Sequence, residues 1–479
     1  MSIAALFVIG ISTSIILLYL RKRQKSIEIL SVIASILEGI VGSFLMYRVL
    51  QTESFSYGYF RVDALSALMI GITLFLNVIA TVYAVGYLRG EREKQTITVN
   101  RLWQCYLCLQ IFFLSMIMAL LTSVPIIMWI AIEGTTLSTA FLINFFERER
   151  DIEAPWKYLI INTLGLLLAL LGTLIFSATL KGHRLITWET FIENAHFLNP
   201  VMVKYGFALI LIGYGTKMGL VPLHTWKPDA YNKGPIPLVA LLSTAILNVA
   251  LYALLRFRII TDMVLGPLFA QQLFIFFGII SLAVGSVIVY TQRNYKRLLA
   301  YSSIESAGLF MLAFAFGGVG TIAGLLHIIY NSLSKALLFF VAGNSALKYS
   351  SSEIKDVRGM ATVLPTTSIL LVIGFLSITG LPPFGMFLTE LYILLAGIPA
   401  HPFIVGAMFV CLLLVFIGFL RMTFSMVYGS APTNIPKGET NNWTIVPLII
   451  LGAFVLISGV YLPPFIITLV QQSFILLQQ

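Results

Sequence analysis

The chain has 479 residues, of which 59% are hydrophobic and only 10% are charged, and its mean hydropathy is +0.95. A soluble domain carries about 25% charged residues, so this composition excludes a soluble globular protein and predicts an all-α polytopic membrane protein. The net charge of +10 could suggest nucleic-acid binding. However, the positive residues gather in short loops between apolar runs, a pattern that orients a membrane protein, so no nucleic-acid partner is expected.

Apolar runs of roughly 20 residues, the length that crosses a lipid bilayer, follow one another along nearly the whole sequence. We place fourteen spans, at 1–20, 28–50, 65–88, 102–122, 124–146, 157–180, 202–227, 235–258, 269–291, 297–316, 319–346, 363–397, 401–428 and 443–463. They leave no room for a separate soluble domain, so residues 1–479 are interpreted as one integral membrane domain. The first run lacks a cleavage site and is interpreted as a span, not as a signal peptide.

The loops and helix ends that follow the odd-numbered spans hold 20 of the 30 Lys and Arg residues. Because positive residues collect on the cytoplasmic side, we predict a protein of the plasma (inner) membrane with both termini on the outer side. Cys105 and Cys108 have the spacing of a redox motif, but they lie inside an apolar span without a second pair. They are interpreted as packing thiols, and no cofactor, metal or catalytic residue is expected.

The first ionisable residues met along the spans are Glu38, Asp63 and Glu133. Asp63 opens the third span and is expected to cap its helix, whereas Glu38 could be interfacial or could pair with a basic neighbour. Glu133 lies near the centre of the fifth span. A charge there costs roughly 3 kcal/mol, so such residues are usually functional. The alternative is a protonated glutamate that forms hydrogen bonds between helices.

The stretch 205–258 is the most informative part of the chain. It begins as an apolar helix with Lys217 near its middle, breaks at Pro222, passes through His224 and re-enters an apolar run. A broken helix at membrane depth is tolerated only where protein or a wet cavity satisfies the free backbone groups, so we interpret this stretch as an ion path. In the next span Ser243 could simply bond back to its own helix, whereas the Asn248 amide needs polar partners or water.

The eleventh span carries His327, Asn331 and Lys335 at positions i, i+4 and i+8. This spacing places the three side chains on one helix face over about 12 Å. Because the row ends in a lysine inside an apolar span, we interpret it as a hydrated seam, not as packing. Two further acids, Glu305 in the tenth span and Glu390 after a second proline break in the twelfth, extend the set.

The two proline breaks, GLVPL at 219–223 and GLPPF at 380–384, indicate an internal duplication. Paired broken helices in corresponding halves are typical of inverted-repeat transporters. We therefore predict spans one to three at 1–100, five-helix repeats at 101–260 and 261–430, and the last span with a short tail at 431–479. The alignment of the two repeats with each other stays open, because the breaks are 161 positions apart, whereas Glu133 and Glu305 are separated by 172.

Four segments in the same order resemble the signatures of the antiporter-like membrane subunits of respiratory complex I and Mrp antiporters. They are GTKMGLVPLHTWKPDAYNKGPIPLVALLSTAILNVALYALLRF, YKRLLAYSSIESAGL, LLHIIYNSLSKALLF and GLPPFGMFLTELYIL. The resemblance covers nearly the whole chain. The phrase WKYLIINTLG, the span around Asn248 and the SSIE at 302–305 are most similar to hydrogenase-4 component F of membrane-bound hydrogenases of the formate hydrogenlyase type.

This resemblance implies proton or sodium translocation through a central hydrophilic axis, coupled to redox chemistry in partner subunits. The matching positions imply that translocation is carried by Glu133, Lys217, His327, Lys335 and Glu390. Secondary positions are His224, Ser243, Asn248, Glu305 and Asn331.

Three positions depart from the family pattern. Many members have a lysine where this chain has Asn248, several have a histidine where it has Asn331, and Trp-Lys-Pro at 226–228 replaces the usual Trp-Leu-Pro.

The resemblance thus implies an antiporter-like, proton-translocating subunit of an energy-converting oxidoreductase such as a membrane-bound hydrogenase, without a redox centre of its own. Its expected partners are the lipid bilayer, the transported ion and the other membrane subunits of a hydrogenase or complex I-like assembly. Two alternatives stay open: a non-pumping membrane scaffold for the redox partner, and a stand-alone cation antiporter or bicarbonate-uptake subunit. The sequence leaves open whether the ion is H⁺ or Na⁺.

Overall fold

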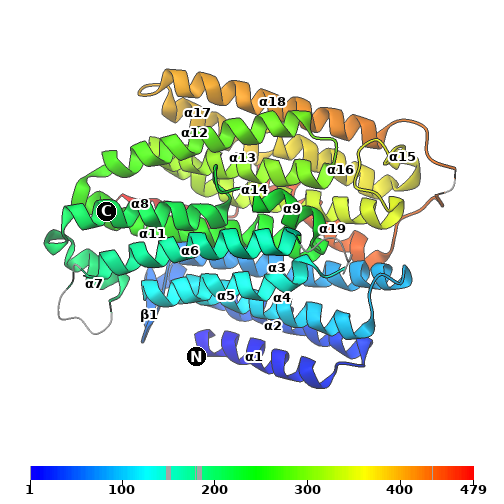
Figure 1. Ribbon diagram of the computed structural model, residues 1–479, viewed down its shortest axis with the longest axis horizontal. Coiled ribbons are helices and arrows are strands. Elements are labelled where there is room, and N and C mark those ends of the chain that lie inside the picture. Colours follow the sequence, from blue (N-terminus) through cyan, green and yellow to red (C-terminus); the bar gives the residue numbers. More distant parts are fainter. Residues whose placement is uncertain (1, 147–152, 179, 181–185, 434, 479) are drawn as a thin grey trace.

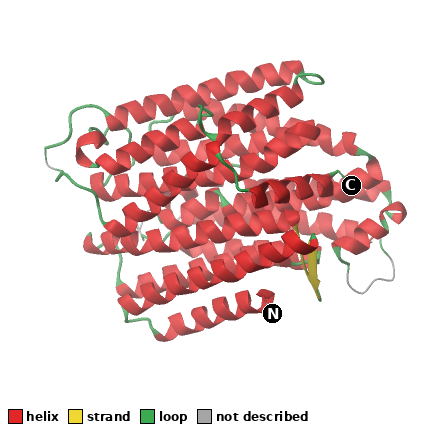
Figure 2. Cartoon of the chain, turned by 180° about the vertical axis from the view of Figure 1, so that it is seen from behind, coloured by secondary structure: helices red, strands yellow, loops and turns green. Residues whose placement is uncertain are grey.

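The computed structural model describes residues 2–146, 153–178, 180, 186–433 and 435–478. Long helices lie side by side and run along one common direction (Figures 1 and 2), with a single small hairpin at one end of the bundle in the described part. Eleven helices in this part are long and apolar enough to cross a membrane. The chain is therefore a multi-pass membrane protein, as the composition predicts.

The N-terminal third contains six long helices and the hairpin. Their bounds are α1 (Ser2–Tyr19), α2 (Gln24–Thr52), β1 (Ser54–Tyr57), β2 (Phe60–Asp63), α3 (Ala64–Glu93), α4 (Val99–Leu121), α5 (Pro125–Ile143) and α6 (Glu153–Ala178). Asp63 caps α3 in a reciprocal capping box with Ser66, which confirms the expected role of this residue. Proline at the first turn, as in α5, suits helix starts because its missing N–H would be unpaired there anyway.

The middle of the chain contains the first broken helix. The elements here are α7 (Trp188–Glu193), the 3₁₀ turn η1 (Ala195–Phe197), α8 (Pro200–Met218), α9 (Trp226–Lys233), α10 (Ile236–Ser243) and α11 (Ala245–Leu265). The predicted break after Lys217 is present, because α8 ends at Gly219 in the left-handed conformation and α9 starts only at Trp226. A further interruption that the sequence did not indicate separates α10 from α11 at Thr244.

The C-terminal part contains the second broken helix. Its elements are α12 (Pro267–Thr291), α13 (Tyr295–Phe316), α14 (Gly318–Tyr349), α15 (Met360–Val363), α16 (Pro365–Ile378), α17 (Gly385–Gly397), α18 (Pro402–Val427), α19 (Asn442–Val460) and α20 (Pro464–Leu477). The predicted break around 380–384 separates α16 from α17. The tail forms α20, an unanticipated short helix that packs against α3 and α14.

Helix α14 lies at the centre of the molecule, with α5 on one side and α17 on the other (Figure 1). It contacts α3, α10, α13, α16, α17, α19 and α20, and nearly all of its side chains are buried. By contrast, α2 and α18 expose apolar side chains such as Ile40 and Phe409, as helices that face lipid or neighbouring subunits do. The buried polar residues of the bundle centre therefore lie on and around α14.

The short helix α7 packs onto the bundle through buried aromatic side chains. Trp188 and Phe191 are both buried, with the Trp188 ring 5.0 Å from that of Phe257. Of the two roles left open for Glu38, neither is seen, since the side chain is not at the surface and forms no ion pair with a basic residue in the described part of the chain. It is fully buried and accepts a hydrogen bond from Gln110 at 2.5 Å, with Asn77 at 3.4 Å.

Candidate functional site

Lys217 lies in the last turn of α8, buried between α5 and α6. Its Nζ donates to Thr136 Oγ1 at 2.8 Å and to the Tyr158 hydroxyl at 3.2 Å. Glu133 is one turn before Thr136 on α5, accepts a hydrogen bond from Thr163 at 3.2 Å and interacts electrostatically with Lys217. No direct ion pair forms between these described side chains, and hydroxyl groups hold the lysine instead.

A second lysine–glutamate pair lies between α13 and α14. Lys335 is fully buried and donates to the Ser302 hydroxyl. Glu305, one turn further along α13, accepts a hydrogen bond from Ser306 at 3.2 Å and interacts electrostatically with Lys335. The sequence ranked Glu305 as a secondary position, whereas in the structure it interacts electrostatically with Lys335, as Glu133 does with Lys217.

His327 connects α14 to the second broken helix. Its Nδ1 is 2.9 Å from Thr389 Oγ1, and that hydroxyl donates to the Met386 carbonyl. The Thr389 proton is therefore used, so Nδ1 of the imidazole carries the hydrogen and Nε2 is left as an acceptor. Nε2 is buried without a hydrogen-bond partner among the described residues, so it can still accept a hydrogen bond.

Glu390 follows Thr389 on α17 and lies against the helix break. A Cβ on Gly380, whose φ is +60°, would be 2.2 Å from the Glu390 carboxylate. The glycine thus provides both the backbone turn and the space for this side chain. Glu390 also interacts electrostatically with Glu305, so two acids from the two sides of α14 share one region.

The secondary positions fall into two groups. Asn248 donates to Ser332 of α14 at 2.9 Å, and Asn331 is fully buried in the seam, so both lie with the central set. The Ser243 hydroxyl donates to the Ala240 carbonyl of its own helix at 2.9 Å. This is the local bond that the sequence analysis considered, and it does not join Ser243 to the central set. His224 is half-buried in the α8–α9 break, with its ring centroid 6.4 Å from that of Tyr301.

Sequence reasoning did not select Lys227, although this side chain is fully buried beside the same set. Its Nζ donates to the Met218 carbonyl at 2.5 Å, and it interacts electrostatically with Lys335. The departure from the family's Trp-Leu-Pro pattern at 226–228 could have drawn attention to this lysine. Lys157, at the start of α6, forms ion pairs with Glu153 and with Asp229.

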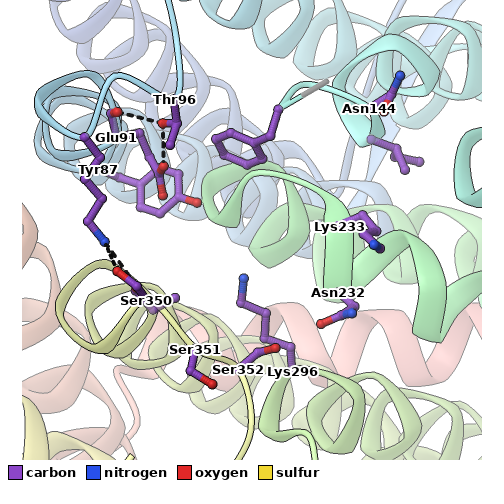
Figure 3. Close-up of a pocket in the computed structure, with 14 residues that line it drawn as sticks. Tyr87, Glu91, Thr96, Asn144, Asn232, Lys233, Lys296, Ser350, Ser351 and Ser352 are labelled. Atoms are coloured by element: carbon purple, nitrogen blue, oxygen red, sulfur yellow. Dashed lines mark hydrogen bonds between the residues drawn. The ribbon is translucent and has the colours of Figure 1, made fainter. Parts of the chain in front are cut away.

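A polar cavity of about 350 Å³ opens at the end of the bundle where α3, α9, α13 and α14 meet (Figure 3). Its lining residues are Tyr87, Glu91, Lys94, Thr96, Ile143, Asn144, Phe146, Asn232, Lys233, Lys296, Ala346, Ser350, Ser351 and Ser352. On one side Lys94 donates to Ser350 at 2.8 Å and Thr96 to Glu91 at 2.7 Å. Asn232 and Lys233, from the C-terminal end of α9, lie on the other side of the cavity.

Within the described ranges, no group of three or more His, Cys, Asp or Glu side chains is arranged to hold a metal ion. Cys105 and Cys108 are free thiols, and Cys105 is buried. The chemistry that the site does offer is proton exchange, because its lysines, glutamates and imidazole can each bind and release a proton.

The described part of the chain is thus a multi-pass bundle with two broken helices and two buried lysine–glutamate pairs, as expected for an antiporter-like membrane subunit. Residues 122–417 match the family described as NADH:quinone oxidoreductase/Mrp antiporter, transmembrane, and the chain belongs to that family. It is 33% identical over 457 residues to a hydrogenase-4 component F homolog of Methylacidiphilum infernorum, covering 94% of each chain. It is 29% identical to NADH-quinone oxidoreductase subunit N of Desulforudis audaxviator, over 86% of this chain and 84% of that one.

Solved structures share the fold. A chain of the archaeal membrane-bound sulfane sulfur reductase (MBS), a respiratory membrane complex, superposes with a TM-score of 0.87 at 24% identity, covering 99% of this chain and 97% of that one. A chain of the Mrp complex from Dietzia superposes with a TM-score of 0.85 at 17% identity, covering 98% and 96%. At these identities the similarity is one of fold.

Proposed function

We propose that this chain is a proton-translocating, antiporter-like subunit of a membrane-bound hydrogenase or complex I-like assembly. Supporting this, a relative at 33% identity over most of both chains is a hydrogenase-4 component F homolog, and another is a subunit of NADH-quinone oxidoreductase. Redox chemistry in partner subunits would supply the energy. The transported ion is the proton, because the central groups are lysine, glutamate and histidine and not a cage of oxygen ligands.

The observation that carries this proposal is a set of buried polar atoms without hydrogen-bond partners among the residues that the structure describes. The atoms are Glu133 Oε2, Asn248 Oδ1, His327 Nε2, Asn331 Oδ1 and Asn331 Nδ2. Buried polar groups are nearly always hydrogen-bonded to protein or to water, and four residues of one predicted axis leave such atoms open. Water molecules along the axis would satisfy them and would also carry protons between the titratable groups.

The proposed architecture is that of fourteen spans with two inverted five-helix repeats, at 101–260 and 261–430. Each half supplies one broken helix and one buried lysine that interacts with a glutamate, Lys217 with Glu133 and Lys335 with Glu305. Both termini would lie on the outer side of the plasma (inner) membrane, because most Lys and Arg residues lie at the opposite end of the spans.

In the proposed mechanism the position of each glutamate controls whether its lysine keeps a proton. While Glu133 is near, its negative charge stabilises the Lys217 ammonium. When the carboxylate moves away, the buried ammonium becomes costly and releases its proton along the axis. Thr136 and Tyr158 keep the neutral amine hydrogen-bonded, so the lysine remains in place in both states. His327 would then accept a proton on Nε2, which has no partner among the described residues, and release one from Nδ1, which faces Thr389 beside Glu390.

Lys217→Ala tests the proposal in inside-out membrane vesicles that contain the whole complex. We expect proton uptake during turnover to fall at least tenfold, because the first titrating group is lost. Lys204→Ala is the matched control, since Lys204 lies on the same helix but is exposed and should leave uptake unchanged. Both complexes are purified to check assembly, and undiminished uptake in an assembled Lys217→Ala complex would rule out this mechanism.

A second candidate, cation antiport, is favoured by the 28% identity to Na(+)/H(+) antiporter subunit A1 of Staphylococcus epidermidis, over 80% of this chain and 50% of that one. Radioactive sodium flux in the same vesicles separates the two candidates. Sodium movement that disappears in Lys217→Ala would support antiport. Turnover without any movement of protons or sodium would instead leave the chain as a membrane scaffold for its redox partner.

A further inference from the structure

Lys227 is a fully buried lysine to which the mechanism above assigns no role. Among the described residues it forms no ion pair with a carboxylate, and its Nζ donates to the Met218 carbonyl at 2.5 Å. A buried charge that lacks a carboxylate partner is costly. A lysine is thus an expensive choice at a position where an apolar side chain would pack, and this cost points to a function.

The position of Lys227 lies between the two lysine–glutamate pairs. The carbonyl that accepts its hydrogen bond belongs to the residue directly after Lys217. On its other side, Lys227 interacts electrostatically with Lys335 of α14. Helix α9 accordingly appears in the middle of the bundle, between α5 and α17 (Figure 1). A proton on Lys227 therefore influences both halves of the axis.

The local structure suits an amine that gains and loses a proton. The Met218 carbonyl is at the C-terminal end of α8, where the helix dipole is negative and stabilises an ammonium. A neutral amine can donate to the same carbonyl, so the hydrogen bond survives in both states. Gly219 provides the space, because a Cβ there would be 2.5 Å from Cδ of Lys227.

Helix α9 also connects Lys227 to the polar cavity. Lys227 and Lys233 are six residues apart on this helix, or about 9 Å along its axis. Lys233 and Asn232 line the cavity at its far end (Figure 3). The cavity lies at the ends of the spans where most Lys and Arg residues gather, so in the proposed orientation it opens toward the inner side.

We infer that Lys227 is a third titrating lysine of the axis, which takes up protons supplied through the inner cavity and links Lys217 with Lys335. This inference rests on the proposed function. In each step one N–H bond breaks on the donor lysine and one forms on the acceptor lysine, with water between them, and no electrons are transferred. The ammonium charge moves with the proton, so the two neighbouring lysines are favoured in the neutral state while Lys227 is protonated.

Several other titratable groups surround Lys227 and would share in its pH dependence. Lys227 interacts with Lys335 of α14, His224 of the break and Tyr231 of α9. Tyr158 of α6 and Tyr301 of α13 follow behind them, next to Tyr231 and His224 respectively. The tyrosines stay neutral near pH 7. The nearby groups that can change charge in that range are therefore His224 and the lysines.

Lys227→Gln tests the inference, because glutamine keeps a donor for the Met218 carbonyl but cannot exchange a proton at neutral pH. Proton uptake per turnover in inside-out vesicles is expected to fall at least fivefold. Lys348→Gln is the matched control, since Lys348 also donates to a backbone carbonyl, that of Gly438 at 2.7 Å, but lies at the edge of the bundle. Normal uptake in the assembled Lys227→Gln complex would overturn the inference and leave Lys227 as a cap of α8.

Lys227→His separates proton exchange from a merely structural role and decides the matter if the glutamine variant does not assemble. Histidine titrates near pH 6.5, far below lysine, so uptake should persist with a pH profile shifted by at least one unit toward acid. An unchanged profile would overturn the inference. If Lys217→Ala pumps normally as well, the proposed function itself fails, whereas loss in Lys217→Ala with normal uptake in Lys227→Gln refutes only the role of Lys227.

Discussion

At the scale of single residues, hydroxyl groups hold the two lysines that interact with glutamates. Lys217 donates to Thr136 and Tyr158, and Lys335 donates to Ser302. A direct buried salt bridge would keep both groups charged, because neutralising one of them leaves the other as an uncompensated buried charge, which is costly. Hydroxyls can stabilise either protonation state, since each is both a donor and an acceptor. The arrangement therefore favours groups that change charge over groups that only hold helices together.

The interaction of Glu305 with Lys335 predicts the effect of Glu305→Gln. We expect proton uptake per turnover to fall at least tenfold, because the amide cannot stabilise the Lys335 ammonium. Glu93→Gln, an exposed glutamate at the end of α3, should leave uptake unchanged. If Glu305→Gln pumped like the parent complex while Glu133→Gln did not, the two pairs would not be equivalent.

At the scale of elements, the two helix breaks could be predicted from the sequence, whereas their contacts could not. Proline together with a nearby lysine or glutamate indicated interruptions near 222 and 382, and both are present. The same reasoning missed Lys227, because its role depends on how α9 folds back onto the end of α8. It also missed the interruption at Thr244, where the hydroxyls of Ser243 and Thr244 both bond to the Ala240 carbonyl. Ser and Thr hydroxyls can compete for helix carbonyls wherever they occur, so the sequence does not show at which position this competition interrupts a helix.

The first break predicts that Gly219→Ala is destabilising. The residue has a φ of +79°, and an added Cβ would approach the Lys227 side chain. The left-handed backbone alone costs an L-residue about 1–2 kcal/mol. A lower thermal unfolding temperature of the purified protein in detergent would show this. Gly406→Ala should be neutral or slightly stabilising, since a Cβ there meets no atom within 4 Å and alanine favours helix. Equal unfolding temperatures for the two variants would contradict the expectation.

At the scale of the whole molecule, a buried ion pair joins segments far apart in the chain. Asp63 caps α3, and both of its carboxylate oxygens accept from Arg256 of α11 at 2.6 Å. Sequence analysis predicted the cap but not this second use, because nothing in the local pattern relates the two positions. Membrane spans and their boundaries follow from composition. Long-range polar pairs such as this one, or Asn248 with Ser332, depend on how the spans pack.

The pair predicts a pH-dependent stability. Burial alone would raise the pKa of the Asp63 carboxyl, but the charge of Arg256 and the hydrogen bonds from Arg256 and Ser66 hold it below its ordinary value. The stabilisation is therefore fully present above the unfolded pKa of about 3.9 and is lost as the pH falls through the lower folded value. Asp63→Asn should cost about 3–5 kcal/mol at pH 7, because it leaves a buried guanidinium unpaired.

Thermal unfolding in detergent between pH 7 and pH 3 measures this dependence. The difference between Asp63→Asn and the parent protein should shrink toward the acid end. Glu193→Gln, an exposed carboxylate at the end of the nearby α7, should match the parent protein throughout. A difference that stays constant with pH would mean that capping geometry, and not charge, is what Asp63 contributes.

Helices α5, α14 and α17, which carry the polar groups of the proposed axis, follow one another across the bundle, so the axis runs crosswise to the common helix direction (Figure 1). In a membrane, the axis thus lies parallel to the bilayer plane. A charge that moves sideways at constant depth does almost no electrical work, whereas a full crossing against 100 mV requires about 2.3 kcal/mol. The membrane voltage should therefore act mainly on the short segments of the proton path that join this axis to either surface. If water or ions leaked through those segments, the energy of the proton gradient would be dissipated.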